Sequence, residues 1–420
     1  MKRSGVTDLP LHYGRVPQWL GERMTRLGRA IAEVIVDQHG PDALLARLAD
    51  PFWFQALGCV MGMDWHSSGV TTSVVGALKR AVNPIGRDLG LYVCGGRGKH
   101  SRRTPDELEA VAALHGLDGG ALVRASRLSA KVDNTCVQDG FSLYLHTFVV
   151  TSAGQWAVVQ QGMNPDLRLA RRYHWHSAAV RTFVDDPQSG VVGEGQGLIT
   201  NLSDSRAAGS RAGIVEFLHE HPERQMREVR RLVMDPAHQV GRRHVDEKRL
   251  AAVLTTAYER NVPEFTDALL LPGVGPRTMQ ALALVGEVIY GAPHRFDDPA
   301  RFSFAHGGKD GSPFPVPLKV YDESIAFLRS ALDRSAVERS EKLASLRKLT
   351  AFTEFVEQRY DRTVDTERVI QQERAMSPAY GGRTVFDQAV TKRHRPRKQS
   401  GPEQLSLFDS LSAGGHEGLV

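Results

Sequence analysis

The sequence has few cysteines, no long apolar run and no large excess of either charge. Its three cysteines, Cys59, Cys94 and Cys136, lie far apart, so neither a disulfide framework nor a paired-cysteine zinc site is supported. No run of about 18 apolar residues occurs, and the first residues carry no apolar signal segment. We therefore expect no membrane span and a cytoplasmic protein. The formal net charge of +5 permits a polyanionic partner without requiring one.

The composition is that of an ordinary soluble chain that is long enough for several cores. It has 420 residues, of which 41% are hydrophobic and 24% charged. The patterning predicts an α+β protein: a mixed α/β domain with a β-hairpin, a mainly helical domain, a helical extension and a disordered basic tail. We assign these four parts to residues 1–205, 206–350, 351–391 and 392–420.

A β-hairpin is predicted near the end of the first domain. Residues 141–151 and 155–161 are rich in valine and aromatic residues, and a short turn with Gly154 joins them. Asp139 lies at the entry of the first strand, and Gln160 lies at the exit of the second. The two ends are neighbours in an antiparallel pair, so we expect these polar side chains to meet.

A glycine turn between two apolar helical runs dominates the second domain, in residues 263–291. It reads Leu-Pro-Gly-Val-Gly-Pro-Arg-Thr over residues 271–278, where glycine permits close approach and proline suits a helix start. The segment resembles the helix-hairpin-helix motif of DNA repair proteins. We expect it to hold a nucleic-acid backbone through Gly273, Gly275, Arg277 and Thr278. The alternative is a structural turn between buried helices.

Basic segments elsewhere could add phosphate contacts. Residues 95–105 form a glycine-rich basic loop, which is not a nucleotide P-loop because Val93 and His100 stand where that motif needs glycine and serine or threonine. A plain solvated loop is the alternative. The further residues that we expect to bind DNA are Arg97, Lys99, Arg171, Arg172 and Lys309.

The tail ends in a short apolar peptide. Residues 392–398 are basic without apolar periodicity, and residues 404–408 read Gln-Leu-Ser-Leu-Phe. This pentapeptide resembles the motif by which bacterial polymerases and repair proteins bind the DNA sliding clamp. The resemblance implies a polar anchor, Gln404, and three apolar plugs, Leu405, Leu407 and Phe408. An inert tail is the alternative.

Several strings occur in the order of one known family. They begin at Asp64, Gly95, Lys131, Gln160, Arg171 and His306, and read DWHSSG, GGRGK, KVDN, QQGMN, RRYHW and HGGKDG. Together they resemble the prokaryotic family called domain of unknown function 763, over about residues 1–350. The resemblance implies no activity, because the family is uncharacterised.

A metal-dependent DNA nuclease is the favoured hypothesis for the chemistry. Asp133, Asp139 and Gln160 would hold Mg²⁺ or Mn²⁺. The remaining candidates are Asp64 as a further ligand, Lys131 or Lys99 as the cation, and His66 or His174 as acid or base. The pattern faintly resembles restriction-type nucleases, but their second-strand carboxylate and lysine are missing. A polar core that only locks the fold is the alternative.

Two other functions stay open. A helix-hairpin-helix glycosylase would place a catalytic aspartate near Asp297 or Asp298, while Arg277 stands where the lyases of that group carry lysine. A non-catalytic DNA-binding adaptor needs only the hairpin, the basic loops and the tail. In each case we expect a nucleoid-associated protein of DNA repair or replication whose partners are DNA and the bacterial sliding clamp.

Overall fold

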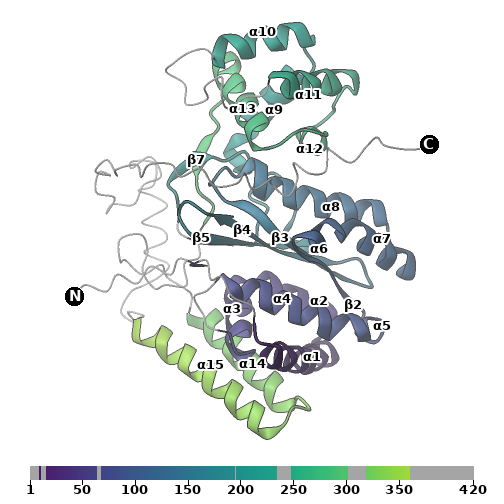
Figure 1. The fold of residues 1–420 in the computed structure, drawn as a ribbon, viewed down its shortest axis with the longest axis vertical. Coiled ribbons are helices and arrows are strands. Elements are labelled where there is room, and N and C mark those ends of the chain that lie inside the picture. The colour runs from purple at the N-terminus through teal and green to yellow at the C-terminus, as the bar shows by residue number, and fades with distance from the viewer. Residues whose placement is uncertain are drawn as a thin grey trace.

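An antiparallel sheet forms the centre of the molecule (Figure 1). The computed structural model describes residues 9–10, 16–63, 68–193, 195–233, 247–300 and 318–359. The sheet has the strand order β1-β5-β4-β3-β2, and β6 pairs with β5. In that order the strands are Leu9–Pro10, Leu169–His176, Trp156–Asn164, Ser142–Thr151 and Leu91–Arg97, with β6 at Gly190–Val192. The fold is α+β, as the sequence predicts.

Strands β3 and β4 form the predicted hairpin. Val150 pairs with Trp156 beside the turn, and His146 pairs with Gln160 near the middle. Gly154 has a φ of 83°, a left-handed angle that glycine adopts without strain. The hairpin prediction is confirmed, and β5 continues the sheet next to β4.

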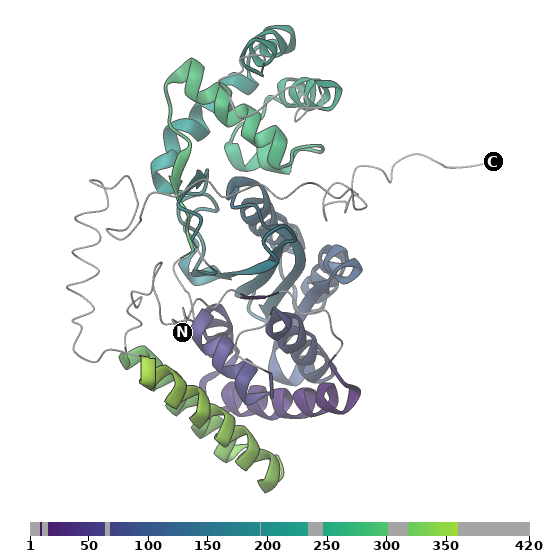
Figure 2. The same ribbon diagram turned by 60° about the vertical axis from the view of Figure 1, so that its left-hand side comes forward.

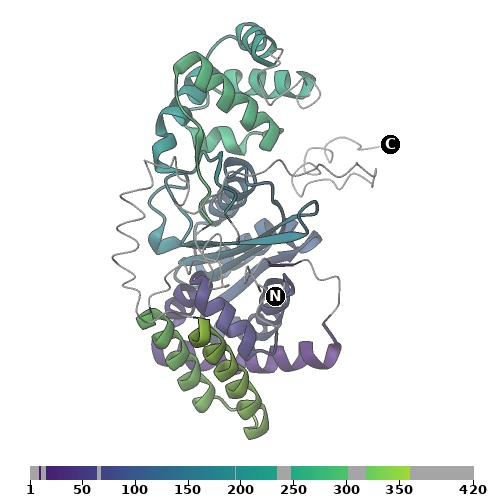
Figure 3. The ribbon, with the colours of Figure 1, turned by 90° about the vertical axis from the view of Figure 1, so that its left-hand side faces the viewer.

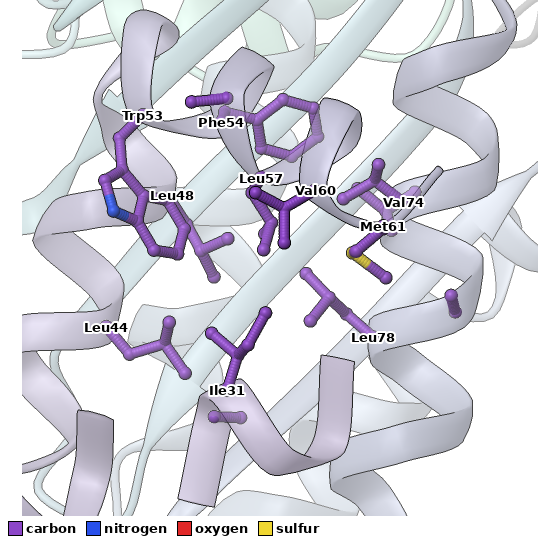
Figure 4. Packing of buried hydrophobic residues seen from close by; sticks show 14 of the residues in the cluster. Ile31, Leu44, Leu48, Trp53, Phe54, Leu57, Val60, Met61, Val74 and Leu78 are labelled. Atoms are coloured by element: carbon purple, nitrogen blue, oxygen red, sulfur yellow. The ribbon is translucent and has the colours of Figure 1, made fainter. Parts of the chain in front are cut away.

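Four helices cover one face of the sheet with a dense apolar core. They are α1 (Gln18–His39), α2 (Pro41–Ala49), α3 (Pro51–Val60) and α4 (Gly69–Val82). All ten residues of α3 are buried. The start of α3 is capped by Asp50, whose carboxylate accepts from the amides of Phe52 and Trp53. Figure 4 shows Trp53 and Phe54 packed with side chains of α1, α2 and α4.

The chain returns to this same layer after residue 317. Helices α14 (Leu318–Arg334) and α15 (Arg339–Arg359) pack against α1 and α3. They therefore belong with the first domain, and the assignment of residues 206–350 to one helical domain is wrong at its C-terminal end. The expected tail and most of the expected extension, residues 360–420, lie outside the described part of the chain.

The other face of the sheet carries α7 (Thr104–His115) and α8 (Gly119–Lys131). A π-helical segment, Val132–Cys136, follows α8 directly. Five helices beyond them form the helical unit, defined here as residues 208–290. They are α9 (Ala208–Leu218), α10 (Pro222–Val233), α11 (Glu247–Glu259), α12 (Phe265–Leu270) and α13 (Pro276–Tyr290). The helical unit lies at one end of the long axis and α14–α15 at the other (Figures 2 and 3).

A small two-stranded sheet brackets the helical unit. Strand β7, Leu198–Thr200, precedes the unit and pairs antiparallel with β8, Arg295–Asp297, which follows it. Thr200 stands opposite Arg295 in this register. The chain therefore leaves and re-enters the body of the protein at one place.

The outer edge of β2 is covered by side chains. Asn83 accepts from the amide of Val93 and donates to its carbonyl, at 2.8 and 2.9 Å. Glu107 accepts from the amide of Gly95, while Lys79 donates to the carbonyl of Gly95 and pairs with Glu107. These contacts satisfy backbone groups that would otherwise be open to another strand.

Short elements complete the fold. They are η1 (Asn83–Ile85), α5 (Gly86–Leu89), α6 (Lys99–Arg102), η3 (Ser177–Ala179) and η4 (Ser205–Ala207). Across the described ranges, no helix combines the length and apolarity that crossing a bilayer requires.

Candidate functional site

The carboxyl group of Asp133 lies fully buried at the centre of the molecule. It sits in the π-helical segment that follows α8, a kind of distortion that recurs at functional sites. One oxygen accepts from the side chains of Gln160 and Trp175, at 2.5 and 2.8 Å, and the other accepts from Gln188 at 2.8 Å. Burial raises the pKa of Asp133 to about 8, although the three donors act in the opposite direction.

A hydrogen-bonded chain leads from Asp133 to α8. The side-chain N–H of Gln160 donates to Asp133, and the side-chain oxygen of Gln160 accepts from His146 Nδ1 at 2.8 Å. His146 Nε2 then accepts from the hydroxyl of Ser126 at 2.8 Å. Burial lowers the pKa of His146 to about 4, which keeps the ring neutral. The chain resembles a nucleophile–base relay, but Ser126 is only 3% exposed and is closed to a substrate.

The expected metal ligands do not form a metal site. Asp133 and Gln160 are in contact, but N–H hydrogens point at the carboxylate oxygens where a cation would have to bind. Asp139 lies elsewhere, bonded to Arg171 and Tyr173. The expected contact between Asp139 and Gln160 is therefore wrong. In the described residues no group of three histidine, cysteine or carboxylate side chains could hold a metal ion, so the residues do not fit Mg²⁺ or Mn²⁺.

Arg171 ties three segments together instead of contacting DNA. Its guanidinium pairs with Asp139 at 2.6 Å and with Asp298 at 2.8 Å, and all three side chains are 2% exposed or less. Burial raises the pKa of Asp139, while the charge of Arg171 acts against that rise. Phe141 packs under the guanidinium, 4.6 Å from ring centroid to Cζ. A buried arginine cannot reach a phosphate, so the DNA-binding assignment of Arg171 is wrong for this conformation.

Arg172 and His174 lie on the opposite face of the sheet, under α3 and α4. Arg172 is fully buried and donates to Gln55, Thr71 and the carbonyl of Pro51. It also donates from Nε to His174 Nε2 at 2.8 Å. Burial holds the pKa of His174 well below its ordinary value, so this histidine is a poor acid at neutral pH. Arg172 is therefore closed to DNA, where we expected a phosphate contact, and His174, expected as acid or base, is buried away from any substrate.

The aspartates expected for base excision have structural partners. Asp298 is held by Arg171 and by the amides of Gln196 and Ala300. Asp297, on β8, pairs with Arg206 at 3.0 Å. Both aspartates follow α13 in the chain, as that hypothesis expects, but each is held in an ion pair with an arginine of the fold, and the glycosylase hypothesis stays a prediction.

The turn between α12 and α13 is open to solvent and firmly docked. Gly273 has a φ of 84°, and a Cβ there would lie 2.9 Å from Val253. At Gly275 a Cβ would meet no atom within 4 Å, and Arg277 is exposed. No side chain caps α13 at Gly275, and Pro276 has no N–H, so the amides of Arg277 and Thr278 are the ones at the helix start that lack an intrahelical acceptor. Thr278 is half-buried and bonds to the carbonyl of Gly273.

The carbonyls of this turn accept hydrogen bonds from side chains of other segments. Lys131 donates to the carbonyl of Val274 at 2.5 Å, and Gln138 donates to that of Pro276 at 2.9 Å. Arg249 of α11 donates to the carbonyl of Gly273 at 3.3 Å. Lys131, expected to serve catalysis, therefore docks the hairpin onto the segment that carries Asp133.

The basic loop is partly a strand. Gly95, Gly96 and Arg97 extend β2, where Gly95 lies against the carbonyl of His146 too closely for a Cβ. Arg97 and Lys99 are exposed, and Arg97 lies over the ring of Tyr144 at 5.6 Å. Their position permits contact with a polyanion. Four expected groups, Asp64, His66, Lys309 and the peptide at residues 404–408, lie outside the described residues.

Sequence reasoning missed His146, Trp175 and Gln188 as members of the Asp133 network. A histidine among the apolar residues of β3 is the one available signal, since buried polar groups require partners. Gln188 follows a loop and carries no pattern that would place it beside Asp133.

These features define a layered α+β protein with an antiparallel sheet, a buried polar network and a solvent-facing helical hairpin. The chain belongs to the DUF763 family, because the family model, described as a protein of unknown function, matches residues 5–316. The resemblance of the six strings to this family is thereby confirmed. Neither the curated proteins nor the solved structures contain a match to this chain.

Proposed function

We propose that this protein binds DNA by its backbone through the hairpin of α12 and α13, in DNA repair or replication. One observation carries the proposal: Gly275 leaves an open approach to the start of α13, beside the exposed Arg277. An open glycine at a helix start lets a phosphate approach backbone amides, and a nearby guanidinium adds charge attraction. Contacts of this kind position a duplex without reading its sequence.

The docking of the hairpin supports this role. Side chains bond to the carbonyls of Gly273, Val274 and Pro276. These contacts hold the turn in place, so little conformational entropy is lost when a ligand binds. A turn that only joined two buried helices would not need an exposed arginine or an open glycine.

Binding of a fluorescein-labelled duplex, followed by anisotropy at several salt concentrations, tests the proposal. Gly275→Glu and Arg277→Ala should each weaken binding, the first by repelling phosphate and the second by removing a contact. Arg329→Ala is the control, since Arg329 is an exposed arginine on α14 at the far end of the molecule. Equal affinity for DNA in all four proteins would refute hairpin binding.

The proposal includes no bond-breaking step. The donor arrangement around Asp133 does not fit a divalent cation, so we derive no hydrolysis through Asp133, Asp139 and Gln160. The nuclease and glycosylase hypotheses are decided by incubating labelled DNA, intact or with damaged bases, with Mg²⁺, Mn²⁺ or EDTA. Metal-dependent strand cuts lost in an Asp139→Ala protein that is shown to be folded would support the former, and metal-independent abasic sites lost in a folded Asp297→Ala would support the latter.

We also propose that the peptide at residues 404–408 binds the bacterial sliding clamp. Support comes from its sequence, in which a glutamine precedes three apolar residues near the end of a basic segment. Replacing Leu407 and Phe408 with alanine in the full-length protein should abolish binding to purified clamp and leave DNA affinity unchanged. Retained clamp binding would contradict the proposal.

A further inference from the structure

One face of α8 is directed at the hairpin. Arg124, Arg127 and Lys131 are spaced by three and four residues, so they lie along one side of the helix. Arg124 pairs with Asp267 of α12 at 2.7 Å. Lys131, at the other end, donates to the carbonyl of Val274 in the turn. Arg127 therefore lies between two contacts with the hairpin.

The charge of Arg127 is not used within the described part of the fold. Its side chain is exposed and forms no ion pair there, whereas the neighbouring Arg124 is neutralised by Asp267. Arg277, on α13, is likewise exposed without an ion pair in that part of the chain. Exposed cations without an acidic partner attract a polyanion.

A third cation completes this surface from another helix. Arg249 of α11 is exposed, and its Nε atom binds the carbonyl of Gly273, which fixes the side chain beside the turn. Arg249 binds the turn directly, Arg277 lies in the first helical turn that follows it, and Arg127 lies on α8 between two residues that bind the hairpin. We call these three residues the arginine surface. It is built from side chains of separate elements, and α8 is outside the hairpin itself.

We propose that the arginine surface binds successive phosphates along one DNA strand, with Arg127 as the contact that extends the grip from the hairpin onto α8. This inference rests on the proposed function. Phosphates follow one another at about 3.4 Å of helical rise per strand, so a strand that meets the turn carries its next phosphates past neighbouring side chains. The ligand is thus a run of backbone, and not a single terminal phosphate.

The slope of affinity against salt tests this directly. Each phosphate contact contributes about 0.9 to the slope of log affinity against log salt for duplex DNA. Arg127→Ala should therefore lower the magnitude of the slope by about one and weaken binding equally for unrelated sequences. Arg127→Lys should restore most of it, since lysine still carries the charge. Arg329→Ala is again the matched control, and thermal unfolding verifies that each variant is folded.

The outcomes separate the two proposals. If wild type binds DNA and Arg277→Ala weakens it, but Arg127→Ala has the slope of wild type, the arginine surface is refuted and hairpin binding stands. If Arg127→Ala and Arg329→Ala lose affinity alike, the effect is one of overall charge, and the arginine surface is again refuted. If wild type binds no DNA, both proposals fail.

Discussion

At the scale of single residues, the molecule uses its polar groups to hold itself together. Asp133, Arg171 and Arg172 are among its most buried side chains, and the described contacts of each come from distant parts of the chain. The sequence predicted functional roles for all three, Asp133 as a metal ligand and the two arginines as phosphate contacts, while charged residues are also found in a core when they are paired. That signal is real, but it does not distinguish a site for substrate from a buried lock, since both require charged residues that must be paired.

Asp133 gives the stability of the protein a distinctive dependence on pH. Its pKa of about 8 lies above the ordinary value of 3.8, so between these values the folded state holds a proton that the unfolded state has lost. Stability from this group therefore falls as pH rises. We expect Asp133→Asn, which cannot ionise, to be less stable than wild type at pH 6.5 and to close that gap towards pH 8.5. Urea unfolding across this range measures it.

Other groups that titrate cancel in the comparison, because both proteins contain them. The pKa of His146 is about 4 in the folded protein and 6.5 in the unfolded chain. This histidine therefore lowers the stability of the protein only below about pH 6.5. Parallel curves for Asp133→Asn and wild type between pH 6.5 and 8.5 would show that the carboxyl stays ionised in the fold.

Arg171 should be one of the costliest residues to remove. Arg171→Met leaves the carboxylates of Asp139 and Asp298 buried without their cation, which costs about 3–5 kcal/mol of the free energy of unfolding. Arg206→Met is the control, because Arg206 also pairs with two aspartates but is 58% exposed, and should cost less than about 1 kcal/mol. Chemical denaturation gives both values. Similar losses for the two variants would contradict the buried-lock interpretation.

At the scale of helices and strands, the local sequence patterns correctly predicted the strands that are joined by a short turn. The β3–β4 hairpin follows from two runs of β-branched and aromatic residues with Gly154 between them. The position of Asp139 did not follow, because the order of strands in a sheet depends on packing and not on local sequence. Strand β5 lies beside β4, and the partners of Asp139 are Arg171 and Tyr173 of β5 instead of Gln160.

The edge of β2 is protected by one asparagine in particular. Asn83→Ala removes both hydrogen bonds to Val93, so it should cost about 1–3 kcal/mol and expose backbone groups to other chains. We expect a lower melting temperature and more aggregation on heating, measured by scattering. Gln18→Ala, which removes an exposed bond to Glu22, should do neither. A soluble, fully stable Asn83→Ala would show that the edge needs no cover.

At the scale of the whole molecule, the apolar core formed by α1–α4, called the first core here, also contains residues of α14 and α15. The family match ends at residue 316, yet α14 and α15 pack on α1 and α3. Sequence patterns predict helices there, but they carry no information on which layer a helix joins after a long excursion. The four helices at the start share one apolar core with α14 and α15, which lie at the end of the molecule away from the helical unit (Figure 3).

Substitutions in α14 test this closure. Leu328 and Leu332 are fully buried, so replacing either by alanine should cost about 2–5 kcal/mol. Leu343→Ala is the control on α15, because Leu343 is 47% exposed and should change stability little. Chemical unfolding of the full-length variants measures all three. Leu328→Ala with the stability of Leu343→Ala would show that α14 is dispensable to the first core.

The pairing of β7 with β8 places the two ends of the helical unit side by side. Thr200 and Arg295 stand opposite each other, so one tight turn could join them if the intervening residues were deleted. When the two ends of a segment lie close together, the segment can be inserted into a loop of another protein without distorting that loop. The protein thus has the connectivity of a domain insertion, in which a body made of two chain segments carries a helical unit that shares its apolar core.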